Sequence, residues 1–225
     1  MEHSLRVEFH CHTIFSKDSL TRPERLVHAA RQKGLDRVIV TDHNNIDGAL
    51  RARAIDPQLI IVGEEIMTDR GELLAAYVSE QIPARLTPQE TIRRLREQGA
   101  FISVSHPFDE MRSGHWTPAD LLEILPLVDA IETFNSRCMN TEYNTKAQAF
   151  AREHNIPGTV GSDAHTAMEL GRSSLLLDAF ASGEELRHVI GQGRAQTRLS
   201  SPLIHLTSRF AVTVKKLGGG KLPAA

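Results

Sequence analysis

Two histidines flank a single cysteine in the stretch VEFHCHT, where His10 and His12 surround Cys11. Side chains alternate between the two faces of a β-strand, so we expect both imidazoles on one face and the thiol on the other. Two imidazoles on the same face can bind one metal ion. An isolated pair of this kind is more often a coincidence at a strand end, so the metal hypothesis depends on the residues that accompany it.

Further residues able to bind a metal lie at the ends of other predicted strands. They are Asp42 and His43 after VIVT, Glu64 and Glu65 after IIVG, His106 after FISVS, Glu132 and Asn135 within AIETFN, and Asp163 and His165 within GTVGSDAH. Asp18 lies in the loop after the first strand. The carboxyl ends of parallel strands meet at one rim, where active sites lie. One such residue alone is usually a core histidine or a helix cap, but five clusters at equivalent positions favour a metal site.

The candidate ligands are imidazoles and carboxylates, and no thiolate is among them because Cys11 is expected to face away. This set suits zinc, manganese or iron, and the spacing does not choose between them. The candidates outnumber what one ion needs, so we expect two or three divalent ions that share bridging carboxylates. A cluster of this kind activates water and binds a phosphoryl or acyl oxygen.

These ligands must be positioned by strands that alternate with helices. Predicted strands cover residues 5–9, 37–42, 59–66, 72–78, 100–106, 130–135, 158–163 and 172–177. Predicted helices cover residues 21–34, 87–99, 141–155 and 183–193. Several strands are apolar on both faces, as in a buried parallel sheet. The alternation predicts a parallel α/β architecture, either a barrel or a doubly wound sheet.

Two of the helices carry start signals in the sequence. Thr21 and Thr87 are the expected N-caps, each with a glutamate three residues later, and Pro88 stands at the first helical position of the second helix. Each of these two helices is expected to end at a glycine.

The chain of 225 residues, with 40% hydrophobic and 24% charged residues, has the composition of a soluble globular protein. Its length suits one α/β-barrel domain. We expect this domain over residues 1–200, and a C-terminal helical segment with a flexible tail over residues 201–225. The stretch FAVTV at residues 210–214 is an alternative strand within that segment.

The net charge of −2 gives no basic excess to indicate a nucleic-acid-binding protein. Two cysteines do not make a disulfide framework. The first residues lack the apolar core of a signal peptide, and no apolar run reaches membrane-spanning length. We therefore expect a cytoplasmic protein without a membrane partner.

The series HCHT, TDH, GEEI, SHP and GSDAH resembles the PHP family, the polymerase-and-histidinol-phosphatase family of metal-dependent phosphoesterases. The resemblance runs from about residue 5 to about residue 180, with the motifs in family order. It implies a distorted (β/α)7 TIM-like barrel that holds a trinuclear metal site. The resemblance thus favours a barrel over an open sheet, which the alternation of elements leaves undecided.

The resemblance also implies which residues bind each ion. His10 and His12 correspond to ligands of one ion, together with Asp163. Glu65 corresponds to the bridging carboxylate, which leaves Glu64 pointing away.

The other two ions have their own implied ligands. His106 corresponds to a ligand of the second ion. Asp18, His43 and His165 correspond to the ligands of the third, and we expect these three to take part in catalysis. Asp42 is expected to orient a neighbouring ligand rather than to bind metal itself.

One ligand of the second ion departs from the family pattern, in which a further histidine often occurs at one of two places. This chain has Glu72 at the first place and Glu132 or Asn135 at the second. Glu72 is either a ligand by substitution or an exposed acid at a strand end.

Basic residues near the rim are further candidates. Arg137 follows AIETFNS and is expected to assist catalysis, and Arg172 is a second candidate. Arg112 and His115 lie in the loop DEMRSGHW, which is long enough to act as a lid. The alternative for each of these four residues is an ordinary solvated surface charge.

These features predict a metal-dependent hydrolase of a phosphomonoester or a nucleotide-type phosphoester, acting through metal-activated water. The expected partner is a small phosphorylated substrate or, as a second hypothesis, a single-stranded nucleic-acid end. Alternatives are an exonuclease acting at the 5′ end, a histidinol-phosphatase-like enzyme, a metal-dependent amide hydrolase and a non-catalytic PHP module. The charge argues against extended duplex binding, and eight ligands in place argue against the non-catalytic module.

Overall fold

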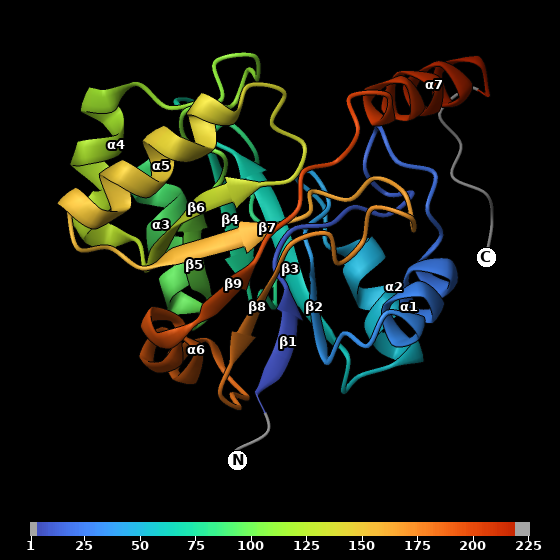
Figure 1. Ribbon diagram of the computed structural model, residues 1–225, viewed down its shortest axis with the longest axis horizontal. Coiled ribbons are helices and arrows are strands. Elements are labelled where there is room, and N and C mark those ends of the chain that lie inside the picture. The colour runs from blue at the N-terminus through green and yellow to red at the C-terminus, as the bar shows by residue number, and fades with distance from the viewer. Residues whose placement is uncertain (1–3, 219–225) are drawn as a thin grey trace.

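Nine strands form one sheet within residues 4–218, the part of the chain that the computed structural model describes (Figure 1). The strands are β1 Leu5–Glu8, β2 Arg37–Val40, β3 Ile60–Met67, β4 Glu72–Ala76, β5 Phe101–Val104, β6 Ala130–Asn135, β7 Gly158–Gly161, β8 Ser174–Leu177 and β9 Arg194–Gln196. Their spatial order is β7-β6-β5-β4-β3-β2-β1-β8-β9. Seven consecutive strands of the chain therefore lie in sequence order across the sheet.

The sheet curves round until the chain after β1 meets the chain after β7. Cys11 and Ala164 form a parallel bridge there. The N–H of His12 donates to the carbonyl of Ala164 at 2.8 Å, and the N–H of Ala164 donates to the carbonyl of His10 at 3.3 Å. β1 to β7 thus enclose a barrel, and β8 and β9 extend the sheet beyond β1. The expected (β/α)7 barrel is confirmed, and the doubly wound sheet is wrong.

β4 is the strand that distorts the barrel. It pairs antiparallel with both β3 and β5, whereas β1–β2, β2–β3, β5–β6 and β6–β7 are parallel pairs. The chain passes from β3 to β4 through residues 68–71 without a helix. Because β4 runs in reverse, its first residue, Glu72, lies on the rim where the neighbouring strands end.

Seven helices cover the barrel within the described residues (Figure 1). They are α1 Pro23–Gln32, α2 Asp47–Ile55, α3 Pro88–Glu97, α4 Pro118–Ile124, α5 Thr141–Glu153, α6 Gly183–Val189 and α7 Ile204–Leu217. A large apolar core lies between these helices and the strands, and includes Leu26 of α1, Val38 of β2, Leu95 of α3 and Ile102 of β5. In Figure 1, α7 lies apart from the other helices, at the upper right.

The helix starts agree with the sequence for α3 but not for α1. The Thr87 side chain accepts from the N–H of Glu90 at 3.3 Å, as expected. Helix α1 instead has Arg22 as its N-cap, without a side-chain cap. The expected N-cap Thr21 is wrong because its hydroxyl donates to the carbonyl of His165 at 3.0 Å, joining two loops of the rim.

The C-terminal region contains helix α7, so the alternative strand at residues 210–214 is wrong. Residues 219–225 of the expected tail lie outside the described residues. The division at residue 200 stays a prediction. No helix within residues 4–218 is both long and apolar enough to cross a membrane.

Candidate metal centre

His10 and His12 lie directly after β1, and both side chains are buried. Their ring centroids are 5.1 Å apart. The thiol of Cys11 lies in the apolar layer outside the barrel and contacts the carbonyl of Ile39 at 3.5 Å. The alternation of side chains along the strand end therefore turns both imidazoles toward the barrel interior.

Asp163, which follows β7, meets this pair of imidazoles. Its Oδ1 lies 3.2 Å from Nε2 of His12 and 3.6 Å from Nε2 of His10. One ligand atom from each of the three residues lies within 4.8 Å of the others, close enough for a shared ion. The first implied ligand group is thus brought together from the first and the last strand of the barrel, β1 and β7.

Glu65 of β3 stands at the centre of the cluster and contacts four imidazoles. Its Oε1 lies 3.1 Å from Nε2 of His106 and 3.4 Å from Nε2 of His10. Its Oε2 lies 2.9 Å from Nδ1 of His43 and 3.5 Å from Nε2 of His12. A carboxylate whose two oxygens face different sets of imidazoles has the position expected of a bridging ligand.

Asp18 joins the cluster from the loop between β1 and α1. Its Oδ2 lies 3.1 Å from Nε2 of His165 and 3.6 Å from Nε2 of His43. His12, His43 and His165 also form a group whose ligand atoms lie within 4.8 Å of one another. The three residues implied for the third ion thus lie together, and His12 lies within reach of two of them, His43 and His165.

Glu72 also reaches the centre. Its Oε2 lies 3.5 Å from Nε2 of His106, and its Oε1 lies 4.0 Å from Nδ1 of His43. It forms a group of three possible ligands with His43 and Glu65. Only 7% of the Glu72 surface is exposed, so the alternative of an exposed strand-end acid is wrong.

Glu132 and Asn135 of β6 support the cluster from behind. Oε1 of Glu132 lies 2.9 Å from Nδ1 of His10. Oε2 of Glu132 accepts from the N–H of His106 at 2.9 Å and from Nδ2 of Asn135 at 3.1 Å. A carboxylate in this position would hold the imidazole ring of His10 so that its Nε2 atom is available to a metal ion.

Asp42 has a comparable supporting position behind His12. It accepts from the hydroxyl of Ser16 at 2.6 Å, and Oγ of Ser16 lies 3.1 Å from Nδ1 of His12. Ser16 also accepts from the N–H of His43 at 3.0 Å. The sequence argument missed Ser16, and the one available signal is its place among the hydroxyl residues of the loop that carries Asp18.

Two of these residues have strained backbones. The φ angles of His106 and Asp163 are 22° and 51°, in the left-handed region that residues other than glycine rarely adopt. Such conformations cost on the order of 1–3 kcal/mol each and persist where the surrounding structure enforces them, often at functional sites.

The crowded charges shift the pKa values of the ligands in opposite directions. Burial alone would lower the pKa of His10, but its carboxylate neighbours, first Glu65, raise it well above its ordinary value. Burial and the charge of His165 lower the pKa of His12 to about 3. Burial would raise the pKa of Glu65, yet the imidazoles around it hold it well below its usual range. Shifts of this kind are concentrated at functional sites.

Several ligand atoms are buried and, although some lie close to one another, form no hydrogen bond of suitable geometry among the described residues. They are Nε2 of His10, Nε2 of His12, Oδ1 of Asp18, Oε2 of Glu65, Nδ1 of His106 and Oδ1 of Asp163. Unpaired buried polar atoms cost free energy, and a divalent cation would satisfy most of them at once. His10 and His12 have their Nδ1 atoms occupied by Glu132 and Ser16, which leaves each Nε2 available. The residues therefore fit a metal centre.

Two of the four basic candidates lie beside this cluster. Nη2 of Arg112 contacts Oδ2 of Asp163 at 2.5 Å, and its Nε contacts Asp109 at 3.1 Å. Arg137 is buried, with Nε 3.6 Å from Oε1 of Glu169. Neither arginine is an ordinary solvated surface charge.

Arg172 lies elsewhere. Its guanidinium donates to the carbonyl of Leu199 at 3.1 Å. It lines a separate hollow together with Arg6 and Lys33. The structure thus does not bring Arg172 to the ligand cluster, because the chain turns away from the rim after His165.

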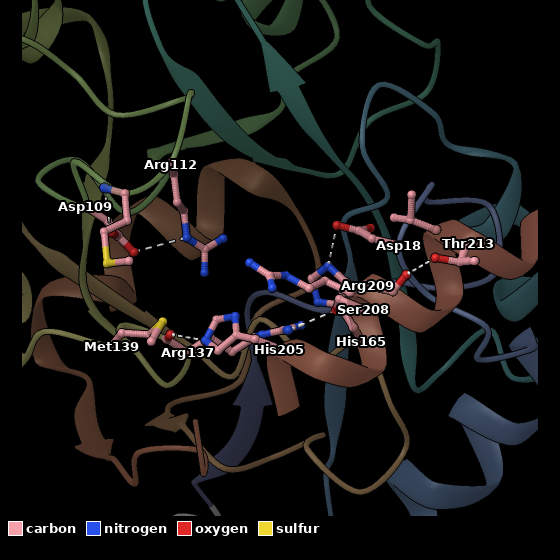
Figure 2. Close-up of a pocket in the computed structure, with 12 residues that line it drawn as sticks. Asp18, Asp109, Arg112, Arg137, Met139, His165, His205, Ser208, Arg209 and Thr213 are labelled. Atoms are coloured by element: carbon pink, nitrogen blue, oxygen red, sulfur yellow. Dashed lines mark hydrogen bonds and ion pairs between the residues drawn. The ribbon is translucent and has the colours of Figure 1, made fainter. Parts of the chain in front are cut away.

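A hollow of about 580 Å³ opens beside Asp18 and His165 (Figure 2). Arg112 and Arg137 line it from the barrel loops, and Arg209 lines it from α7. Pockets of about 300–1,000 Å³ are typical of small-molecule sites. The ligand cluster therefore borders a space large enough for a substrate.

The chain matches known families and proteins over most of its length. Residues 8–86 match the PHP domain and residues 141–195 match the PHP-associated region. An uncharacterised protein of Methanocaldococcus jannaschii is 36% identical over 172 residues, which cover 75% of this chain and 69% of that protein.

Two solved structures share the fold. A two-domain protein of Bacteroides vulgatus, containing a predicted PHP-like metal-dependent phosphoesterase, has a TM-score of 0.71 at 22% identity over 88% of this chain. The match spans 66% of that longer protein. PsfC of Pseudomonas syringae has a TM-score of 0.71 at 17% identity, over 94% of this chain and 99% of PsfC.

Proposed function

This chain belongs to the PHP-domain family, and on that premise we propose that it hydrolyses a phosphomonoester or nucleotide-type phosphoester using two or three divalent ions. The observation that carries the proposal is the convergence of the eight predicted ligands into one cluster with Glu65 at its centre, in which several ligand atoms are buried without a hydrogen bond among the described residues. Imidazole and carboxylate ligands suit zinc, manganese or iron.

The ions would be held by three overlapping sets of ligands. His10, His12 and Asp163 would hold the first, and Glu65 would bridge it to the second. His106 and Glu72 would complete the second, and Asp18, His43 and His165 the third. When bound, such ions supply Lewis-acid activation of the phosphoryl group and of the attacking water.

The residues around the ligands have binding and positioning roles in this proposal. Arg112 uses Nε and Nη2 on Asp109 and Asp163, which leaves further N–H donors for phosphate oxygens beside the cluster. Arg137 donates to the carbonyl of Asp163 at 3.5 Å, and so supports the backbone of a ligand. Asp18 and His165 line the hollow, so the third ligand set is the one nearest the substrate.

The substrate in this proposal is a small phosphorylated molecule, or one end of a single-stranded nucleic acid. The hollow has the volume of a small-molecule site rather than the length of a nucleic-acid groove. The protein has no basic excess for many phosphate contacts.

The test combines metal analysis with phosphate release by the purified full chain. The panel holds an aryl phosphate, nucleoside monophosphates, histidinol phosphate, a 5′-phosphorylated oligonucleotide and an aryl amide. We expect two or three equivalents of metal and phosphate release, both lost in His10→Ala and Asp163→Ala and both kept in Glu153→Gln, an exposed acid of α5. A metal-free, inert protein after supply of manganese, zinc and iron would overturn the proposal, and amide cleavage without phosphate release would redirect it to amide hydrolysis.

A further inference from the structure

We propose that the substrate carries a second anionic group besides the phosphate that is hydrolysed, and that Arg209 of α7 binds this group. The inference rests on the proposed phosphoesterase activity and names its substrate class: a phosphate ester whose alcohol portion bears a carboxylate or a second phosphate. The residues that line the hollow between the ligand cluster and α7 carry the argument (Figure 2).

Two kinds of residue line the hollow. Asp18 and His165 belong to the proposed metal centre, where the hydrolysed phosphate would bind. Helix α7 contributes Ser208, Arg209 and Val212, and in Figure 2 Ser208 and Arg209 lie on the same side as His165, across from Asp109 and Arg112. Figure 2 shows the guanidinium groups of Arg112 and Arg209 extending toward the middle of the hollow. A volume of about 580 Å³ leaves room for an alcohol portion beside the phosphate.

Of the three arginines that line the hollow, only Arg209 has no acidic partner within residues 4–218. Arg112 pairs with Asp109 and Asp163, and Arg137 lies 3.6 Å from Glu169. Arg209 makes neither an ion pair nor a side-chain hydrogen bond to another described residue. An arginine that faces a substrate pocket with all its donors free is suited to bidentate binding of a carboxylate or phosphate.

Helix α7 is fixed to the loops of the barrel by contacts that flank Arg209. Nη2 of Arg137 donates to Oγ of Ser208 at 2.9 Å, and Nε2 of His205 lies 3.2 Å from the carbonyl of Arg137. Six residues beyond Arg209, Nζ of Lys215 donates to the carbonyl of Ile14 at 2.5 Å, in the loop that carries Asp18. His205 lies four residues before Arg209 and therefore on the same helix face. These contacts fix α7 before and after Arg209, which itself lines the hollow.

Three of the residues that line the hollow are apolar, namely Met111, Met139 and Val212. Asp109, His205 and Thr213 also line it. Methionine side chains adapt to ligands of varied shape. The combination fits an alcohol portion that has a carbon skeleton in the middle and an anionic group at the end remote from the ester.

The test compares three aryl phosphates that differ only at the para position: carbamoyl, which is neutral, carboxylate, and a second phosphate. Hydrolysis by the manganese-loaded full chain is measured for wild type, Arg209→Met, Arg209→Lys and the control Arg25→Ala, an exposed arginine of α1. We expect about tenfold higher kcat/KM for at least one anionic compound than for the carbamoyl compound. Arg209→Met should lower kcat/KM for the anionic compounds more than for the carbamoyl compound and so remove this preference. Arg209→Lys should keep part of the preference, and Arg25→Ala should keep all of it.

Calorimetry of binding separates this inference from the proposed function. The same proteins are titrated with para-carboxybenzylphosphonate and para-carbamoylbenzylphosphonate, which cannot be hydrolysed. Tighter binding of the carboxylate that depends on Arg209 supports the inference even if no ester is cleaved. Equal binding and equal hydrolysis of neutral and anionic compounds, or equal losses on all of them in Arg209→Met, would overturn it. In the hydrolysis test, the para group that gives the higher kcat/KM shows whether the second anionic group of the substrate is a carboxylate or a phosphate.

Discussion

Two adjacent glutamates of β3 have opposite environments because side chains alternate along a strand. Glu65 contacts four imidazoles inside the barrel. Glu64 lies on the other face, fully buried, and accepts one hydrogen bond, from the N–H of Ile82 at 3.0 Å. Burial raises the pKa of Glu64 to about 8. The family resemblance implies the direction of both side chains, but not that Glu64 has no cationic partner within residues 4–218.

The raised pKa of Glu64 makes stability depend on pH. Between pH 4.5 and about 8 the unfolded chain has lost this proton and the folded chain keeps it, so the wild type loses stability as the pH rises. Glu64→Gln lacks this loss. Its free energy of unfolding should gain a few kcal/mol relative to wild type between about pH 5 and about pH 9.

Urea denaturation of chelator-treated protein measures this difference at both pH values. Glu153→Gln, which alters an exposed acid of α5, is the matched control and should show no such change. A difference between Glu64→Gln and wild type that stays constant with pH would contradict the assignment.

Glu132 offers a second prediction at the residue scale. Oε1 of Glu132 lies 2.9 Å from Nδ1 of His10, and Oε2 of Glu132 accepts a hydrogen bond from the backbone N–H of His106. Glu132→Gln should weaken metal binding by about 10–100-fold, the usual effect of losing a carboxylate that orients a ligand imidazole. Titration with manganese, followed by calorimetry, gives the affinity. An affinity unchanged from wild type would mean that Glu132 does not orient His10.

At the scale of elements, the expectation that active-site residues lie at the carboxyl ends of the predicted strands located most of the site but not all of it. This expectation identifies ligands near the carboxyl end of β3 and after β1, β2, β5 and β7, because parallel strands end on one rim. Glu72 begins a strand, and the same expectation places it on the far side of the barrel. Only the reversal of β4, which the sequence does not reveal, brings it to the cluster.

Other parts of the structure, among them α2 and β9, could not be predicted because their sequences have no clear hydrophobic periodicity. The buried residues of α2 are Gly48, Ala49 and Ala52, which are too small to give a strong apolar period. Strand β9 has three exposed residues and no apolar alternation. The supporting role of Ser16 depends on how a loop folds back on Asp42, and residue type alone does not determine that.

Strand β7 yields a prediction from close packing. A Cβ at Gly161 would lie 2.4 Å from Cβ of His10 and 2.5 Å from Oε1 of Glu132. Gly161→Ala should therefore displace His10, reduce metal content, and destabilise the fold by about 1–3 kcal/mol through overpacking. Gly191→Ala is the matched control, because its Cβ would meet nothing within 4 Å. Normal metal content in Gly161→Ala, measured by elemental analysis, would contradict this account of the packing.

At the scale of the whole molecule, closure of the barrel and assembly of the metal centre are the same event. The bridge between Cys11 and Ala164 closes the barrel, and each partner is flanked on both sides by predicted ligands. A second isolated bridge joins His43 directly to Glu65. Residues more than 150 positions apart in sequence are thus tied through backbone hydrogen bonds.

An ion at this seam should therefore stabilise the whole barrel. Its ligands come from strands throughout the chain, and binding to the folded state alone adds about 2.7 kcal/mol at a hundredfold excess over Kd. We expect a chelator to lower the Tm of the wild type and manganese or zinc to restore it, as measured by scanning calorimetry. His10→Ala combined with Asp163→Ala should have a Tm that responds to neither. An equal response in this double variant would place the stabilising ion elsewhere, because the ligand atoms at the seam would then be unnecessary for it.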